Sequence, residues 1–182
     1  MKKVVLADIF KLAEAARPKL RQGAKSAGRE VMLYLHWSAG HYDQLFPEYH
    51  INIDGEGTVY TSTDDFSQVK SHTWRRNSGG IGISLACCYG GTTEDLGQEP
   101  PTFIQIEAMA QVIAVLAAAL ELSLERSRIM THAECADEDG YGPATTCERW
   151  DLWFLKNGDT PGTGGDILRG KAIWYQQQGL LR

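Results

Sequence analysis

Residues 31–37, VMLYLHW, form an apolar run of β-prone side chains that predicts a strand buried inside the molecule. The strand would carry His36 to the edge of a sheet. Further along, the stretches YHINID and TVYTST flank the turn residues GEG, which indicates a hairpin over residues 49–63. The run IGISLACC, which begins at Ile81, predicts another strand. These segments together indicate a sheet whose strands end in polar side chains.

Helical patterns surround these strands. Residues up to Gly28 carry apolar side chains at helical spacing, and residues 103–126 are apolar almost all round, which predicts a helix buried against the sheet. RIMTHAE predicts a last strand, and residues 135–151 a long loop. A closing helix to Leu181 would begin at Gly-Gly-Asp, with Asp166 as its N-cap. We therefore expect one α/β domain, residues 29–182, with residues 1–28 as a helical extension that either packs on this domain or only precedes it.

Composition limits the classes of partner. A chain of 182 residues fits a single domain, and a net charge of −5 without any Lys/Arg-rich stretch argues against a nucleic-acid partner. No apolar run reaches the roughly 20 residues that span a bilayer, so no membrane partner is expected. The first residues, MKK, are basic, and the apolar stretch that follows them is interrupted by Asp8 and Lys11. This pattern favours an amphipathic helix over a secretory signal. Synthesis and folding in the cytoplasm are therefore expected.

The four cysteines form no CxxC pair. Cys87 and Cys88 are adjacent, so on a strand they would point to opposite faces. Cys135 and Cys147 flank a polar loop and are far enough along the chain to be bridged, but a cytosolic chain favours reduced thiols. Whether these two are bridged stays open at this point.

Three separate motifs carry side chains that bind zinc: LYLHWSAG with His36, RIMTHAE with His132, and ERWDLW with Asp151. Two imidazoles and a carboxylate hold Zn²⁺ with a fourth position left for water, the arrangement of hydrolytic zinc sites. Two strand ends and a loop would deliver them. A single strand-end histidine is more often a hydrogen-bonded surface residue, and Cys147 is an alternative third ligand.

The motifs HWSAG, YHINIDGEGTVY, SHTWRRNSGGIGISL, THAE and RWD, in that order, resemble the zinc-dependent N-acetylmuramoyl-L-alanine amidase family. This family includes phage amidase-type lysozymes and animal peptidoglycan recognition proteins. The resemblance runs from Val31 to Leu155 and leaves the N-terminal helix outside. It implies a mixed central β-sheet flanked by helices, Zn²⁺ on His36, His132 and Asp151, and cleavage of the amide between N-acetylmuramic acid and L-alanine in peptidoglycan.

The resemblance also implies catalytic side chains. Tyr49 matches the tyrosine that contacts the water at the zinc, where a phenol would orient that water or hold the tetrahedral intermediate. The alternative for Tyr49 is a half-buried strand aromatic. Arg149 stands where many members carry lysine, and it is either an oxyanion-stabilising cation or a surface charge. Ser84 replaces the glutamate of the muropeptide-recycling branch, which favours the tyrosine-dependent branch.

Three further residues are predicted to bind substrate. His72 matches a residue that lines the family's cleft, and Asn77 matches the asparagine before the IGIS strand, where fixing the loop is the favoured role. Trp37 would either stack on substrate or lie in the core. His50 should point away from the face of Tyr49 if both lie on one strand, so we exclude it as a ligand, and His41 is given no role.

Two alternatives to the amidase reaction remain at this stage: a module that binds peptidoglycan without cutting it, and a zinc amidase or peptidase acting on another amide. The expected setting is a phage or prophage endolysin, made in the cytoplasm and acting on the wall after release, although a delivered effector would look similar. The interval between His132 and Asp151 is longer than in compact family members and holds Tyr141, so it is expected to form a cleft wall or lid. The oligomeric state stays open.

Overall fold

The protein, seen in a computed structural model that describes residues 1–180, is built on one six-stranded sheet. Its strands, in spatial order, are β1 (Lys2–Lys3), β4 (Val59–Thr61), β3 (Ile51–Ile53), β5 (Gly80–Leu85), β2 (Met32–Trp37) and β6 (Ile129–Thr131). The sheet is mixed, because β3, β5, β2 and β6 run parallel whereas β4 is antiparallel to both β3 and β1. The predicted hairpin is therefore confirmed as β3 and β4, and the predicted mixed α/β fold is confirmed with it.

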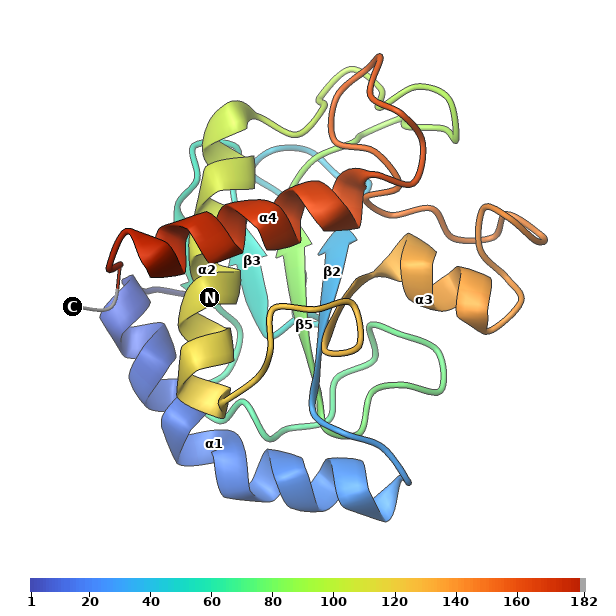
Figure 1. The fold of residues 1–182 in the computed structure, drawn as a ribbon. Coiled ribbons are helices and arrows are strands. Elements are labelled where there is room, and N and C mark those ends of the chain that lie inside the picture. Colours follow the sequence, from blue (N-terminus) through green and yellow to red (C-terminus); the bar gives the residue numbers. More distant parts are fainter. Residues whose placement is uncertain (181–182) are drawn as a thin grey trace.

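Within residues 1–180, four helices pack around the sheet: α1 (Leu6–Ser26), α2 (Phe103–Leu120), α3 (His132–Glu138) and α4 (Gly164–Gln177). In Figure 1, α2 and α4 cross in front of the strands, α1 lies beside α2, and α3 lies at the side of the sheet, next to β2. The helix α2 has the length and composition of a membrane-spanning helix, contrary to the expectation that no apolar run is long enough. Because 67% of it is buried inside the fold, α2 is the central core helix.

The two faces of β2 have different neighbours, because alternate side chains of a strand point to opposite sides. Leu33, Leu35 and Trp37 join the large apolar cluster that contains α2. Met32 and Tyr34 face the other way and pack with residues of β6 and α3. His36 follows the parity of this second pair, so the sheet itself turns the imidazole away from the helical core.

Several element boundaries differ from those predicted. The motif RIMTHAE is not one strand: β6 ends at Thr131 and α3 begins at His132. The helix α2 ends at Leu120 rather than Arg126, because Glu121 adopts a left-handed conformation at its C-cap. At α4 the N-cap is Thr163, and the Asp166 carboxylate instead accepts a hydrogen bond from Arg169. The helix α4 ends at Gln177, short of its predicted end at Leu181, which itself lies outside the described residues.

The segment before Gly28 is packed into the domain. Ile9, Ala13, Ala16, Leu20 and Ala24 recur at helical spacing along α1 and are buried in the same apolar cluster as the sheet. The chain upstream of α1 adds β1 to the edge of the sheet, an element that the sequence pattern did not reveal. A domain boundary at residue 28 stays a prediction, but the helix before it shares one core with the rest.

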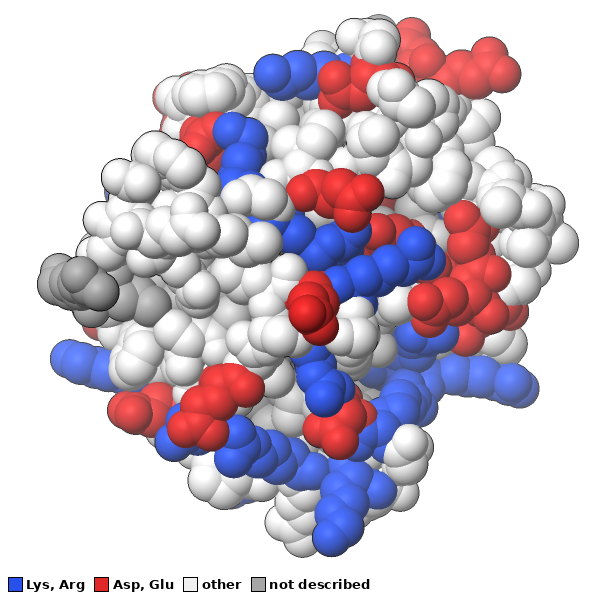
Figure 2. All heavy atoms as spheres, in the orientation of Figure 1, with Lys and Arg blue, Asp and Glu red and all other residues white. Residues whose placement is uncertain are grey.

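Charges of both signs are scattered over the face shown in Figure 2, and basic side chains stand beside acidic ones along the lower part, where α1 runs. Arg17 and Arg21 of α1, for example, both pair with Glu121. Because the two signs alternate, α1 does not present a uniformly basic surface on this face.

Candidate active site

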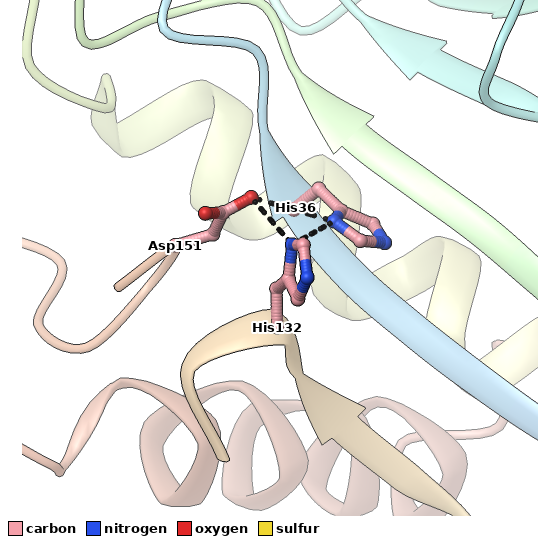
Figure 3. Close-up of side chains that lie close together, drawn as sticks. All are labelled: His36, His132 and Asp151. Carbon is pink, nitrogen blue, oxygen red and sulfur yellow. Dashed lines mark hydrogen bonds and ion pairs between the residues drawn. The ribbon is translucent and has the colours of Figure 1, made fainter. Parts of the chain in front are cut away.

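Three elements deliver the proposed metal ligands to one point (Figure 3). His36 comes from β2, and His132 is the first residue of α3. Thr131 makes this placement possible with a capping box: its hydroxyl accepts the amide of Glu134, while the Glu134 carboxylate accepts the amide of Thr131. Asp151 arrives from the loop, and its carbonyl accepts the Ala133 amide, which ties the loop to the start of α3.

The donor atoms of these side chains have the spacing that a tetrahedral ion needs. Nδ1 of His36 lies 3.2 Å from Nδ1 of His132 and 3.4 Å from Oδ2 of Asp151. The third distance, from His132 Nδ1 to Asp151 Oδ2, is 3.2 Å. Ligands about 2.0–2.1 Å from a tetrahedral zinc are about 3.3–3.4 Å apart, so one ion fits between all three atoms. All three residues are buried.

The electrostatics of the cluster favour neutral imidazole beside ionised carboxylate. Burial lowers the pKa of His36 to about 4, although the hydrogen bond to Asp151 acts in the opposite direction. Burial alone would raise the pKa of Asp151, but the neighbouring His132 and His36 outweigh it and hold this pKa below its usual range. At neutral pH the site therefore presents a free imidazole lone pair and a carboxylate, the protonation states that a metal requires.

A cleft of about 680 Å³ opens beside the cluster. One wall is formed by the loop before β5 and the other by the loop after α3, and the cleft is lined by residues that include His72, Trp74, His132, Tyr141 and Arg149. The long insertion between His132 and Asp151 therefore forms a cleft wall, one of the two roles expected for it. Its first part is helical rather than loop, because α3 continues to Glu138.

Tyr49 lies against the cluster, with its ring centroid 5.0 Å from that of His36. It precedes β3 rather than lying on it, since the strand begins at Ile51. Burial and the charge of Asp151 raise the pKa of Tyr49, so the phenol stays protonated at neutral pH. Ser84, on β5 directly opposite His36, is fully buried and occupies the same face of the sheet.

His72 reaches the cleft because β5 has no side chain at Gly82. A Cβ at Gly82 would lie 2.6 Å from Cγ of His72, so only glycine leaves room for this ring. Asn77 fixes the loop that carries His72, since its Oδ1 accepts the amides of His72 and Thr73. This is the role favoured for Asn77 from the sequence, although Asn77 also lines the cleft.

The structure places the remaining candidates as follows. Trp37 is 5% exposed and packs in the apolar core, which agrees with the second of its two expected roles rather than with substrate stacking. Arg149 is exposed at the cleft. Cys147 is not part of the ligand cluster found among residues 1–180, and Cys135 and Cys147 are free thiols.

The two other histidines lie outside the cluster. His50 accepts the amide of Gly82 at Nδ1 and donates from Nε2 to the Gln68 carbonyl, so both its nitrogens are engaged. His41 pairs with Glu99 at a partly exposed site. The exclusion of His50 as a ligand agrees with this placement, although His50 precedes β3, so strand alternation is not the reason.

Sequence reasoning missed two polar partners of the cluster. The hydroxyl of Thr73 lies 3.3 Å from Nε2 of His36, and the hydroxyl of Tyr141 lies 3.4 Å from Nε2 of His132. The only sequence signal was the position of each: Thr73 next to His72, and Tyr141 in the insertion.

The fold and the site together define a mixed α/β protein with a buried cluster of two histidines and one carboxylate that could hold a metal ion. The family model for N-acetylmuramoyl-L-alanine amidases matches residues 14–150, three quarters of the chain. The chain belongs to this family. It is an N-acetylmuramoyl-L-alanine amidase, and the substrate of this family is peptidoglycan.

Two solved structures from Clostridium intestinale URNW are similar to this chain. One is the endolysin amidase LysCS, 18% identical over 57% of this chain and 68% of its own, with a TM-score of 0.42. The other is the amidase LysC, also 18% identical with a TM-score of 0.42, over 57% of this chain and 70% of its own. Among curated proteins no sequence matches significantly.

Proposed function

We propose that this amidase is a zinc enzyme, with Nδ1 of His36, Nδ1 of His132 and Oδ2 of Asp151 as the ligands. The mutual spacing of these three atoms, 3.2–3.4 Å, is the observation that carries the proposal. Bound Zn²⁺ would supply Lewis-acid chemistry, lowering the pKa of a water toward ~7 and polarising the amide carbonyl. The bond cut is the amide between the lactyl group of N-acetylmuramic acid and L-alanine.

The chain's own residues would orient the reactants. Tyr49, a protonated phenol beside His36, donates a hydrogen bond to the attacking water or to the developing oxyanion. Arg149, exposed at the cleft, supplies positive charge for the same oxyanion. His72 contacts the substrate from the opposite wall, on the loop that Asn77 holds in place.

The biological role we propose is cell-wall lysis by a phage or prophage endolysin that is made in the cytoplasm and reaches the wall after release. The mixed charges along α1 fit a protein that recognises its substrate in the cleft rather than through bulk positive charge.

The decisive experiment digests purified peptidoglycan with and without a chelator and identifies the products by mass spectrometry. We expect chelator-sensitive release of stem peptides with a free L-alanine amino terminus, restored by added Zn²⁺. His36→Ala and His132→Ala should abolish release. His41→Ala is the matched control, since His41 is exposed, lies outside the cluster and should leave activity intact.

Three results would contradict the proposal in different ways. Full activity of His36→Ala, or activity that the chelator does not reduce, would show that the proposed metal site is wrong. Chelator-sensitive products that retain the muramyl–alanine bond would show that the protein is a peptidase acting on another amide. If the zinc-loaded protein binds wall material without cutting it, the protein is a recognition module.

A further inference from the structure

Both imidazoles of the cluster are arranged in the same way. Each turns Nδ1 toward the common centre and Nε2 toward a hydroxyl group. For His36 this hydroxyl belongs to Thr73, at 3.3 Å, and for His132 it belongs to Tyr141, at 3.4 Å. The two hydroxyls come from opposite walls of the cleft, so the repeated arrangement does not follow from one local turn.

The chemistry of a neutral imidazole gives these contacts a purpose. A neutral ring carries one proton, and a metal can bind Nδ1 only when that proton is on Nε2. A hydroxyl oxygen that accepts Nε2–H stabilises this tautomer and fixes the plane of the ring. Without such a partner, nothing at Nε2 opposes the other tautomer, which carries its proton on the nitrogen that should face the metal.

Thr73 is built into the wall that carries His72. It is 1% exposed, and its amide is held by Oδ1 of Asn77 at 2.8 Å. Its hydroxyl also lies 2.9 Å from Nδ1 of His72. A hydroxyl that accepts from His36 still has its own proton to donate to His72, so Thr73 can bond to both rings at once.

Tyr141 joins the two ends of the inserted loop through backbone hydrogen bonds. Its amide donates to the carbonyl of Ala136, near the end of α3, and its carbonyl accepts the amides of Glu148 and Arg149. Its ring makes an edge contact with Trp74 across the cleft, with centroids 5.5 Å apart. The backbone of Tyr141 thus holds the segment that leads to Asp151, while its hydroxyl meets His132.

We propose that Tyr141 and Thr73 are positioning residues that fix the two ligand imidazoles in the tautomer and orientation that bind the metal. This role rests on the metal site proposed above. It adds an outer shell of two hydroxyls, and it gives the inserted loop a direct part in holding the metal besides its part as a cleft wall.

The test measures zinc affinity by competition with a chromophoric chelator in the full chain. Tyr141→Phe and Thr73→Val remove each hydroxyl while keeping the shape of the side chain, and Thr73→Ser keeps the hydroxyl. Tyr175→Phe is the matched control, because its phenol hydrogen-bonds to Glu107 between α4 and α2, away from the cluster. Unfolding midpoints of the metal-free proteins show whether each variant is folded.

We expect zinc affinity to fall about 10- to 100-fold in Tyr141→Phe and in Thr73→Val. Thr73→Ser and Tyr175→Phe should bind zinc as the unaltered protein does. The absorption bands of the cobalt-substituted protein should change only in Tyr141→Phe and Thr73→Val. Equal affinities in all four variants would overturn the positioning role alone. Failure of the unaltered protein to bind zinc would overturn the metal site and the positioning role together.

Discussion

At the scale of single residues, Tyr49 shows how burial sets the chemistry of a side chain. Its raised pKa keeps the phenol protonated, so it is available as a donor and not as a base. We expect Tyr49→Phe to lower kcat by about 100- to 1,000-fold with little change in KM, as for loss of an oxyanion donor. Steady-state kinetics on a soluble muropeptide would measure this.

A control for that variant is Tyr60→Phe, which removes a phenol bound to Asp54 on the hairpin, outside the cleft. If Tyr49→Phe and Tyr60→Phe both kept the kcat of the unaltered enzyme, Tyr49 would be only a packing aromatic beside His36.

Individual residues differ in how far the sequence could identify them. His36, His132 and Asp151 stood in ordered motifs, and the structure brings their donor atoms together. Trp37 had two possible roles, and only strand parity, which places it opposite His36 in the core, decides between them. Thr73 could not be found, because its partner His36 is 37 residues away and only the folded sheet brings them together.

At the scale of elements, the join between β6 and α3 controls the position of His132. The motif THAE follows a short apolar run typical of a strand, although T-x-x-E is also the signature of a capping box that starts a helix. A short apolar run gives no periodicity to separate the two interpretations, so the capping signal was the better guide. The fold class was predictable because long patterns such as α2 dominate it, whereas this boundary depended on two hydrogen bonds.

The helix α3 is fastened to α4 by a buried ion pair. Arg169 is 5% exposed and donates two hydrogen bonds to Glu134, at 2.7 and 2.8 Å, and one to the Ile129 carbonyl. Arg169→Leu would leave the Glu134 carboxylate buried without its main partner, and we expect a loss of about 3–5 kcal/mol in the free energy of unfolding. Urea denaturation would measure it.

The matched surface control is Lys19→Leu, which breaks an exposed pair with Asp65 and should cost at most about 1 kcal/mol. Equal, small losses for both variants would show that the Glu134–Arg169 pair does not hold α3.

His50 connects the segment before β3 to β5 through a hydrogen bond that requires a neutral ring, since its Nδ1 accepts the Gly82 amide. Burial lowers its pKa from 6.5 to about 4; the Gln68 carbonyl and Asp65 oppose this shift, and Lys70 adds to it. A histidine whose pKa is depressed in the folded state stabilises the fold above pH 6.5, and this contribution is lost as the pH falls toward 4.

We therefore expect the metal-free protein to lose stability between pH 7 and pH 5, with His50 responsible for about 2 kcal/mol of the loss. His50→Gln, which keeps an acceptor for the Gly82 amide, should reduce the pH dependence by that amount in urea denaturation at the two pH values. The same pH dependence in the variant and the unaltered protein would assign the loss to other groups, such as the buried His36 and His72.

At the scale of the whole molecule, the family match and the packing agree about α1. The match begins at residue 14, inside α1, and the buried face of this helix lies in the same core as α2. The sequence could show that α1 is amphipathic, but not which surface covers its apolar side. The membrane-like composition of α2 also follows from packing, since a helix covered by neighbours on several sides needs no polar face.

The short strand β1 has a consequence for self-association. An unpaired strand edge is a template for pairing with another chain, and β4 would be such an edge without the two residues of β1 beside it. Both residues of β1 are exposed lysines, which repel a further strand. Deleting residues 1–3 should uncover β4 and raise the fraction of oligomers in analytical ultracentrifugation, whereas Lys2→Ser/Lys3→Ser, which keeps the strand, should do so less. Two residues that take no part in the chemistry would then keep the enzyme from aggregating.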